Sequence, residues 1–349
     1  MRKKIAIIGN LGDTRKLTSD GQAVKTRFVT NELIMQYGND SIITFNTYGG
    51  IITLFKAPII CIKALLNASN IIIFPAQNGV RVFVPLLYIL SFFIRKRRLH
   101  YCVIGGWLPS FLKKKFFLKK SLKSFYKIYV ETSTMEMKLV GQQFNNVVVM
   151  PNFKNLTVVS DNNLNFSHSE PYRLCTFSRV MKEKGIGDAI EVIKEINRKL
   201  NRVVYTLDIY GKIDSSQIEW FNNLQSTFPN YISYKGVIDF DKSVDTIKDY
   251  FALLFPTHFF TEGIPGTIID AYAAGVPVIS AKWQSYADII DDGQTGLCYE
   301  FDNIKEFEQI LINVAHNPAL VTSLKQNCIK RAESYLPENA MKILLENLL

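Results

Sequence analysis

Residues 262–280 read EGIPGTIIDAYAAGVPVIS, and they carry the signals of a loop, a helix, a helix end and a buried strand. Glu262 and the turn residues Pro265 and Gly266 come first, and a run of good helix formers follows. Gly275 marks the end of the helix, and the apolar residues after it predict a strand. A loop that leads into a helix beside a buried strand is a common place for a ligand.

The start of this helix is a candidate anion site. Pro265 suits a first helical turn, so the unpaired N–H groups of Gly266, Thr267 and Ile268 should point outward together. Such an end attracts phosphate. Asp270, one turn later on the same face, could accept hydrogen bonds from sugar hydroxyls, and the Glu262 carboxylate faces the same space. The alternative is that both acids only favour the positive end of the helix dipole.

This stretch resembles the family 4 glycosyltransferases, which are retaining enzymes of the GT-B fold that use nucleotide sugars. Their signature is Glu, Gly, a hydrophobic residue and Pro, a second Glu eight positions after the first, and a helix that ends in Gly-x-Pro-Val. Residues 262–265 and 275–278 match it, but the second acid is Asp270, one methylene shorter. The resemblance is strong over residues 174–300 and weak over the first half.

The resemblance implies roles for the matching residues. Glu262 would face the donor sugar, and Asp270 would contact the ribose hydroxyls. The remaining donor-site residues of this stretch would be Gly263, Ile264, Pro265, Gly266 and Thr267.

Two more basic residues precede a second predicted helix. Arg179 follows the apolar run 174–178, and Lys184 stands just before a helix with apolar residues at helical spacing. Arg through its planar fork and Lys as a point charge could clamp a diphosphate, although such residues alone are more often surface charges. The resemblance implies phosphate binding, so Arg179 and Lys184 join Glu262 as catalytic residues. Gly211 follows the next predicted strand, and His258 precedes the stretch 262–280. Both complete the expected donor site, and His258 is equally consistent with loop packing.

The order of apolar runs predicts an α/β protein of two domains. Strands that alternate with helices form parallel sheets, and the resemblance implies the GT-B arrangement of two Rossmann-like domains that face a polar cleft. Residues 1–165 would bind the acceptor, residues 166–336 the nucleotide sugar, and residues 337–349 would form a terminal helix that crosses back to the first domain. The polar segment 154–171 is the expected linker.

The first domain offers weaker signals. Ligands of a parallel sheet lie at the carboxyl ends of its strands, which places Gln77 and Asn78 near the cleft. The loop with Gly12 lacks the G-x-G-x-x-G spacing of a dinucleotide site, and it is either a cleft loop or an ordinary surface loop. Gly106 is the fourth expected acceptor residue. Many members of the resembling family carry a His near Gln77, and this chain does not.

Composition and charge narrow the class further. The chain has 349 residues, of which 48% are hydrophobic and 21% charged, as in ordinary globular proteins. No signal peptide is expected at MRKKIAIIGN, and five scattered cysteines favour reduced thiols in the cytoplasm. The four histidines stand far apart, and Asp241 of the Asp-Phe-Asp at 239–241 is expected to cap a helix, so we expect no metal site.

The charge is concentrated in the first half. Residues 1–155 hold 23 Lys and Arg against 6 Asp and Glu, whereas the rest holds 18 against 25. On a single helical wheel from Pro109, the lysines at 113–123 fill one arc together with Leu112 and Phe116, and the other apolar residues fill the opposite arc. Basic residues interleaved with exposed apolar ones are typical of an interfacial helix on an anionic membrane. A solvated lysine face is the alternative, and nucleic acid is disfavoured because no binding motif is present. The apolar run 82–94 is too short to span a bilayer and predicts a buried helix.

These observations together predict a retaining hexosyltransferase without cofactor or metal. Its donor would be a nucleotide sugar, favouring UDP, and its acceptor a saccharide, favouring a lipid-linked one at the cytoplasmic face of the membrane in bacterial capsule or exopolysaccharide assembly. A nucleotide-sugar epimerase would need acid and base residues that are not evident. A non-catalytic partner subunit is the stronger alternative, because Asp270 and the missing His depart from the active pattern.

Overall fold

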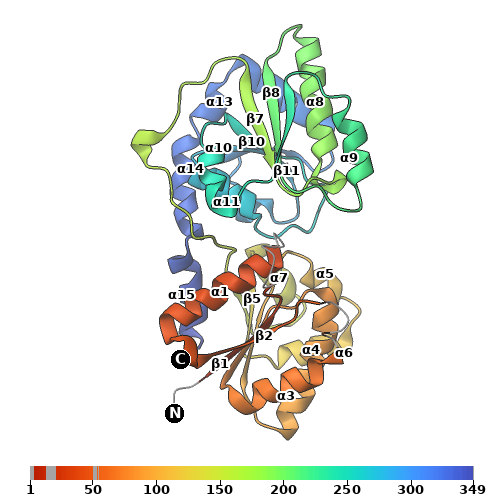
Figure 1. Ribbon diagram of the computed structural model, residues 1–349, viewed down its shortest axis with the longest axis vertical. Coiled ribbons are helices and arrows are strands. Elements are labelled where there is room, and N and C mark those ends of the chain that lie inside the picture. Colours follow the sequence, from red (N-terminus) through yellow and green to blue (C-terminus); the bar gives the residue numbers. More distant parts are fainter. Residues whose placement is uncertain (1–3, 13–20, 50–52, 54, 349) are drawn as a thin grey trace. The chain divides into compact units, whose positions relative to one another are not determined.

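The structure, a computed structural model, describes residues 4–12, 21–49, 53 and 55–348, and it consists of two units (Figure 1). Unit 1 comprises Met1–Asn152 and Glu338–Leu349, and unit 2 comprises Phe153–Pro337. Each unit is an α/β domain built on its own six-stranded parallel sheet. The expected fold class is therefore confirmed.

Unit 1 is built on a sheet with the strand order β2-β1-β3-β4-β5-β6. The inner strands β1 and β3 are buried along their whole length and, apart from Asn70 at the start of β3, apolar, as expected for parallel strands covered on both faces. The strands are β1 (Ile5–Gly9), β2 (Ile42–Asn46), β3 (Asn70–Ile73), β4 (Arg98–Cys102), β5 (Lys127–Val130) and β6 (Val147–Val149). The helices are α1 (Gly21–Tyr37), α3 (Ala57–Asn67), α4 (Gln77–Phe93), α5 (Leu108–Leu112), α6 (Phe116–Lys123), α7 (Ser133–Val140) and the terminal α15 (Pro337–Glu346).

Unit 2 repeats this architecture with the strand order β12-β11-β10-β7-β8-β9. The strands are β7 (Tyr172–Phe177), β8 (Tyr205–Tyr210), β9 (Ile232–Gly236), β10 (Ala252–Phe255), β11 (Val278–Lys282) and β12 (Gly296–Glu300). The helices are α8 (Ile186–Lys199), α9 (Ile218–Gln225), α10 (Ser243–Ile247), α11 (Gly266–Ala273), α12 (Ile304–His316), α13 (Ala319–Thr322) and α14 (Lys325–Ala332). Among the described residues of both units there are also six short 3-10 helices: η1 (Asn39–Ser41), η2 (Asp161–Asn163), η3 (Lys182–Lys184), η4 (Phe240–Lys242), η5 (Tyr286–Asp288) and η6 (Glu333–Tyr335).

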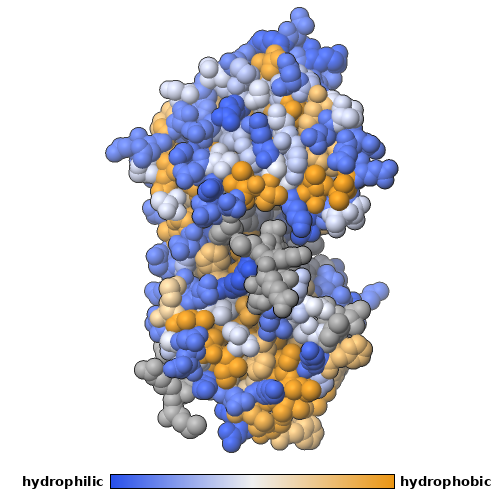
Figure 2. All heavy atoms as spheres, in the orientation of Figure 1, coloured by the Kyte–Doolittle hydropathy of each residue, from blue (hydrophilic) through white to orange (hydrophobic). Residues whose placement is uncertain are grey.

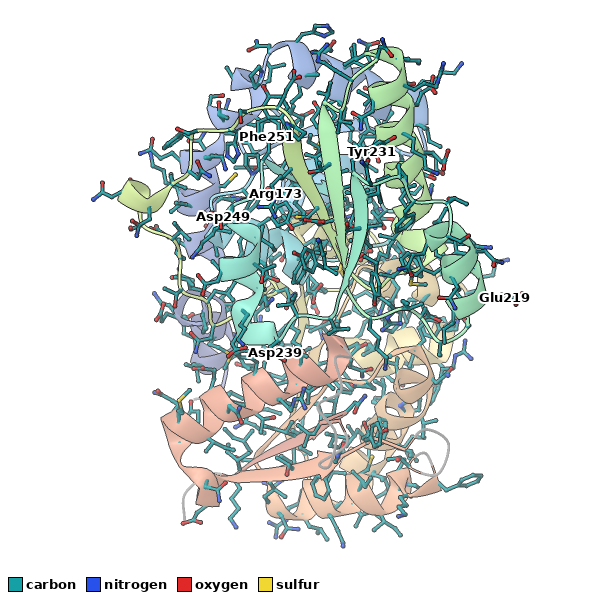
Figure 3. All side chains as sticks on the ribbon, turned by 45° about the horizontal axis from the view of Figure 1, so that its top comes forward. Arg173, Glu219, Tyr231, Asp239, Asp249 and Phe251 are labelled. Carbon is teal, nitrogen blue, oxygen red and sulfur yellow. The ribbon has the colours of Figure 1, made fainter. Side chains whose placement is uncertain are left out.

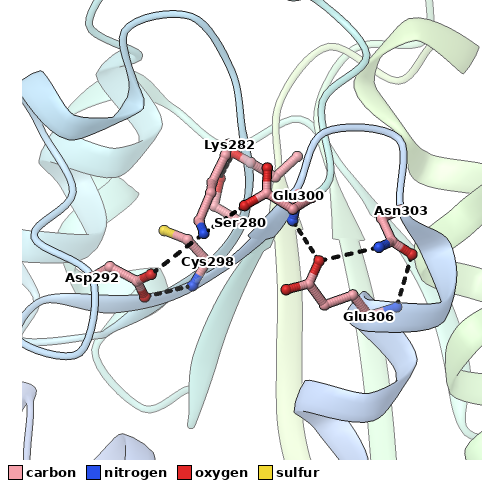
Figure 4. Close-up of polar contacts among 8 residues, drawn as sticks. Ser280, Lys282, Asp292, Cys298, Glu300, Asn303 and Glu306 are labelled. Atoms are coloured by element: carbon pink, nitrogen blue, oxygen red, sulfur yellow. Dashed lines mark hydrogen bonds and ion pairs between the residues drawn. The ribbon is translucent and has the colours of Figure 1, made fainter.

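Polar contacts connect the edge strand β12 to β11 and to α12 (Figure 4). Lys282 Nζ on β11 lies 2.8 Å from Glu300 Oε1 on β12. Asn303 caps α12 by accepting a hydrogen bond from the Glu306 N–H at 3.2 Å, and the Glu306 carboxylate accepts the Glu300 N–H at 2.8 Å. These hydrogen bonds connect the start of α12 to the end of β12.

The boundary between the units lies earlier than residues 165 and 166. Residues 153–164 belong to unit 2 because Leu156, Val158 and Val159 pack against its core and the Val159 N–H donates to the Ala273 carbonyl at 2.8 Å. The terminal residues 338–349 belong to unit 1, where the Asn70 side chain donates to the Leu348 carbonyl at 3.2 Å. The segment expected as a linker is thus largely part of the second domain.

Two helix starts differ from the expected ones. Pro265 is the N-cap residue of α11 and has an extended backbone, so the helix begins one residue later, at Gly266. Asp241 lies inside η4 and does not cap a helix; Asp239 precedes η4, and Lys242 precedes α10. Neither cap position has a side-chain cap hydrogen bond, so the prediction for Asp241 was wrong.

The single helix expected from Pro109 onward is instead two helices, α5 and α6, separated by residues 113–115. In one continuous helix Leu112 and Phe116 would lie on the same face. The break allows the Leu112 side chain to be fully buried while the Phe116 side chain is 83% exposed. The run 82–94 forms the end of α4, but its last turn is not buried, because Phe92 and Phe93 are 71% and 82% exposed. Of the described helices, none is both long and apolar enough to cross a bilayer.

Candidate functional site

The topology of unit 2 singles out one point at the edge of its sheet. The chain builds the sheet outward from β7 through β8 to β9, and then outward from β10 through β11 to β12 on the other side. In open parallel sheets, ligands bind beyond the carboxyl ends of the strands where this order reverses. Figure 3 labels Tyr231 and Phe251 at the amino-terminal edge of the sheet and Asp239 beyond the opposite edge. The loops after β7 and β10 therefore define the candidate site.

These two loops are held against each other by backbone contacts. The His258 N–H, after β10, donates to the Glu183 carbonyl of η3 at 2.9 Å. Gly185 adopts a left-handed φ of 68°, and a Cβ there would lie 1.8 Å from the Pro256 carbonyl oxygen. Only glycine fits this approach. The tight contact sets Lys184 beside the residues that follow β10.

Lys184 and Glu262, two of the predicted catalytic residues, form an ion pair. Their side chains are less than one fifth exposed. The Lys184 ammonium also lies 5.5 Å from the centre of the Phe255 ring and 5.0 Å from that of Phe259, and Thr257 donates a hydrogen bond to the Glu262 carboxylate at 3.3 Å. The cation is therefore positioned by a carboxylate and two aromatic rings.

The start of α11 follows this pair by four residues. The Ile268 N–H donates to the Pro265 carbonyl at 3.1 Å, so the expectation of three outward amides was wrong for this one. Among the described residues, no acceptor lies in hydrogen-bond range of the Gly266 or Thr267 N–H, and the buried Thr267 hydroxyl likewise has no partner. Two amides at the positive end of the helix, and the buried Thr267 hydroxyl beside them, thus have no hydrogen-bond partner among the described residues.

Asp270 differs from its expected role. Its side chain is buried, and its Oδ1 accepts a hydrogen bond from Lys154 Nζ at 2.5 Å. Burial raises the pKa of the Asp270 carboxyl, while Lys154 and a hydrogen bond from Ser243 act in the opposite direction. The carboxylate is therefore engaged within unit 2 and is not open to ribose hydroxyls in this conformation.

Arg179 and Gly211 lie on the β8 side of the switch point. Arg179 Nη1 is 3.5 Å from Asp214 Oδ2, and its side chain is half exposed. Gly211 has φ 134°, and a Cβ there would lie 1.7 Å from the Ser178 carbonyl oxygen, so the backbones after β7 and β8 touch. Arg179 is thus at the same edge of the sheet as Lys184 but contacts a different carboxylate.

His258 has partners on two neighbouring elements. Its Nε2 lies 2.8 Å from Asp188 Oδ2 on α8, and its Nδ1 lies 2.6 Å from Asp302 Oδ1 before α12. Partial burial lowers the pKa of the imidazole, but the hydrogen bond to Asp302 and the charge of Asp188 outweigh it, so the pKa of His258 is raised. A shallow pocket of about 380 Å³ lies here, lined by Lys182, Glu183, Gly187, Asp188, Trp220 and His258.

The raised pKa of His258 predicts a pH-dependent contribution to stability. This contribution is complete below the ordinary pKa of histidine, about 6.5, and is lost as the pH rises through the raised folded-state value. We expect His258→Gln to lower the free energy of unfolding by less than about 1 kcal/mol at pH 5.5, because the pair is partly exposed, and by a smaller amount at pH 8.5. Urea unfolding at the two pH values measures this difference. His316→Gln is the control, since that imidazole contacts a carbonyl and not a carboxylate.

The carboxyl edge of the unit 1 sheet carries the expected acceptor residues. Gln77 and Asn78 begin α4 after β3 and are exposed, and Gly106, in the loop after β4, is buried. Gly12 follows β1 with φ 82°, and its carbonyl accepts a hydrogen bond from the Asn46 side chain at 2.9 Å. All four residues therefore lie beyond the carboxyl ends of parallel strands.

Sequence reasoning missed three charged residues. Lys25 on α1 forms a buried ion pair with Glu131 at 2.7 Å, and Glu131 also accepts the Gly105 N–H at 3.2 Å. Glu131 directly follows β5, and that position after a predicted strand was the available signal. Lys154 was assigned to a linker, and no local pattern connects it with Asp270, 116 positions later.

The fold and the site define a class of protein. The structure is similar over 99% of both chains to Anabaena HepE in complex with UDP, with a TM-score of 0.74 and 12% identity. Its similarity to sucrose-phosphate synthase from Thermosynechococcus elongatus also covers 99% of both chains, with a TM-score of 0.77 and 15% identity. The neighbours are GT-B glycosyltransferases, and the chain has the same two-domain α/β fold.

Sequence comparison points to the second unit. Residues 162–335, which make up most of unit 2, match the family model of the glycosyl transferases group 1. The amylovoran biosynthesis glycosyltransferase AmsK of Erwinia amylovora is 22% identical over 153 residues. That match covers 43% of this chain and 37% of AmsK, little more than a third of the relative's length.

Proposed function

We propose that this protein transfers a sugar from a nucleotide-sugar donor, favouring a UDP-sugar, to a saccharide acceptor with retention of the anomeric configuration. The observation that carries the proposal is the Lys184–Glu262 pair, which tight backbone contacts hold at the switch point of unit 2. The unpaired amides of Gly266 and Thr267 follow within the same loop and helix start. A cation, a carboxylate and a helix end in one place suit a sugar bound through a diphosphate.

The chemistry requires charge neutralisation as the nucleoside diphosphate leaves. Lys184, Arg179 and the amides of Gly266 and Thr267 would bind the diphosphate, and in this proposal they do so without a metal ion or a cofactor. Glu262 would face the donor sugar, beside Gly263, Ile264 and Pro265. Attack by the acceptor hydroxyl on the face that the diphosphate leaves, with a donor phosphate oxygen accepting the proton, would retain the configuration.

The UDP assignment is supported by the structural neighbours. HepE was crystallised with UDP, with UDP and glucose, and with UDP-glucose. TarM of S. aureus, similar over 83% of this chain and 58% of its own, was crystallised with UDP. These proteins share the fold of this chain at 12–15% identity. The identity of the nucleotide is therefore a proposal, and a direct binding measurement tests it.

We extend the proposal to the acceptor and to the location. AmsK is named for amylovoran biosynthesis, which favours a role in a bacterial surface polysaccharide such as a capsule or exopolysaccharide. The excess of Lys and Arg in the first 155 residues favours a lipid-linked acceptor at the cytoplasmic face of the membrane. Gly12, Gln77, Asn78 and Gly106 are the proposed acceptor contacts.

A non-catalytic partner subunit is the alternative. Asp270 is one methylene shorter than the signature Glu, and Lys154 engages it inside unit 2. A protein of this kind could retain the fold without binding a donor. Nucleotide binding separates the two functions.

The first test is calorimetric titration with UDP, GDP and ADP in the presence of EDTA. We expect selective binding of UDP, and a loss of affinity of about tenfold or more in Lys184→Ala and Arg179→Ala, because each removes a charge-assisted contact to phosphate. Lys182→Ala is the matched control, since this lysine of the same turn lies over the Trp220 ring at 5.7 Å. Absence of binding by any nucleotide would favour the partner subunit.

A further inference from the structure

We infer that the outer surface of α3, α4 and α6 in unit 1 docks on an anionic lipid bilayer. The inference rests on the proposed function for its biological purpose and adds to it the side chains that enter the lipid. We call this surface the docking face and define it by the exposed apolar residues of these helices: Ile59, Leu66, Phe92, Phe93 and Phe116. Figure 2 shows apolar side chains gathered on the part of unit 1 where Figure 1 labels α3, α4 and α6.

Helix α3 is apolar on two sides. Its inner side, with Cys61, Ala64 and Leu65, is fully buried in the core of unit 1. Its outer side carries Ile59 and Leu66, which are 58% and 52% exposed and lie two helical turns apart on one face. A helix at a water interface normally has a polar outer side, so this pattern indicates an apolar environment there.

Helices α4 and α6 pack side by side and contribute a cluster of aromatic rings. Tyr88 contacts Phe92 at 5.0 Å and Phe117 on α6 at 6.2 Å between ring centres, which joins the two helices at their outer surface. Phe93 on α4 and Phe116 on α6, each next in sequence to a ring of this cluster, are 82% and 83% exposed. Protruding aromatic side chains on neighbouring helices are the kind of anchor that interfacial proteins insert among acyl chains.

The charges around the docking face identify the occupant as anionic. From residue 41 to residue 130 the chain contains fourteen Lys and Arg and no Asp or Glu. Lys63 on α3, Lys113 and Lys114 before α6, and Lys120 on α6 are exposed. Basic side chains beside exposed phenylalanines match a surface whose outer layer is negative and whose interior is apolar, which is an anionic bilayer.

The same charges disfavour a second copy of this chain as the occupant. Two docking faces brought together would set lysines and arginines against one another with no carboxylate from residues 41–130 to pair with them. The exposed aromatic residues would gain burial, but the uncompensated positive charge would oppose the contact. A bilayer satisfies both features.

Flotation with vesicles tests the docking face. Vesicles of phosphatidylcholine with one third phosphatidylglycerol, and vesicles of phosphatidylcholine alone, are mixed with the full chain. We expect binding to the anionic vesicles, and a loss of about tenfold or more in Phe93→Ser/Phe116→Ser, because two apolar anchors are removed. Phe166→Ser is the matched control: this phenylalanine is 52% exposed in unit 2 and should leave binding unchanged.

The basic residues are tested by Lys113→Glu/Lys114→Glu/Lys120→Glu. We expect binding to the anionic vesicles to fall about a hundredfold, because each basic side chain near an anionic surface contributes about a fivefold gain. Lys115 is left unchanged because its ammonium donates to the Phe111 carbonyl at 2.9 Å and supports the turn. Lys305→Glu, an exposed lysine of unit 2, is the control.

A direct readout excludes an indirect effect of folding. Phe92→Trp should show a blue-shifted emission with anionic vesicles and quenching by brominated lipid, whereas Phe166→Trp should show neither. Each variant is also titrated with UDP, so that loss of vesicle binding with intact nucleotide binding separates this inference from the proposed function.

Two results with vesicles overturn the inference. One is failure of the wild type to bind anionic vesicles, and the other is equal binding by the docking-face variants and by the unit 2 control variants. A dimer in light scattering that Phe93→Ser/Phe116→Ser disperses, without an effect on vesicles, also overturns it in favour of a second copy.

Discussion

Glu262→Ala is expected to reduce sugar transfer by about a thousandfold, because the proposed site loses the one carboxylate that is paired with Lys184 and that would face the donor sugar. The fold should persist. The free energy of unfolding should fall by no more than about 2 kcal/mol, the scale of a single hydrogen bond to a charged group. Lys184 would keep its contacts with the Phe255 and Phe259 rings. A large loss of rate with a small loss of stability is what distinguishes a catalytic residue from a structural one.

The measurement is transfer of labelled sugar from a panel of UDP-sugars to lipid extract, with circular dichroism and urea unfolding as checks on the fold. Glu183→Ala is the control, because this acid belongs to the same turn as Lys184 but accepts a hydrogen bond from the Gln217 side chain at 2.8 Å. Glu262→Gln separates charge from shape. If Glu262→Ala retains transfer at the rate of Glu183→Ala, the catalytic assignment is wrong.

Lys154→Met is expected to destabilise unit 2 by about 3–5 kcal/mol, because it leaves the Asp270 carboxylate buried without its cation. Burial already raises the pKa of Asp270, and removal of Lys154 takes away an opposing influence. A carboxyl whose folded-state pKa is raised contributes stability that is present at low pH and lost as the pH rises through that value. The variant should therefore be less destabilised at pH 4 than at pH 7.5.

A double-mutant cycle gives the interaction energy. Asp270→Asn alone leaves Lys154 buried and should also be destabilising, whereas Lys154→Met/Asp270→Asn should recover much of the loss. Urea unfolding and hydrogen exchange of the α11 amides report on unit 2. Additive effects of the two substitutions would show that the pair contributes nothing, and Asp270 would return as a candidate for the ribose contact.

Local signals in the sequence predicted the elements well. The apolar run 174–178 and the apolar residues after Gly275 became β7 and β11 with small shifts at the ends, since a short buried strand needs only β-forming residues and turn residues around it. Gly275 was predicted to mark the end of the helix in the stretch 262–280. It follows the C-cap of α11 with a left-handed φ of 66°. The prediction of one continuous helix from Pro109 onward was wrong. A local pattern of lysines and apolar residues does not show that Leu112 must be buried in the core.

The candidate site was likewise predicted only in part from the sequence. Lys184 and Glu262 are 78 positions apart, and the family resemblance identified both, but their ion pair depends on the close approach of Gly185 to Pro256. His258 was expected to be either a donor contact or part of loop packing, and its pairing with Asp188 and Asp302 joins three elements that are distant in sequence. No spacing rule predicts such a meeting.

The sequence by itself determined the parallel α/β class, the positions of most strands, the start of helix α11 near Pro265 and Gly266, and the concentration of positive charge in the first half. Each depends on residue type and local spacing, which the chain carries directly. Only the tertiary structure decided that Lys154 engages Asp270, that Lys25 pairs with Glu131, and that α4 packs against both α3 and α6 while phenylalanines of α4 and α6 stay exposed. Those outcomes depend on which distant segments share a core, because burial and contact are properties of the packed chain.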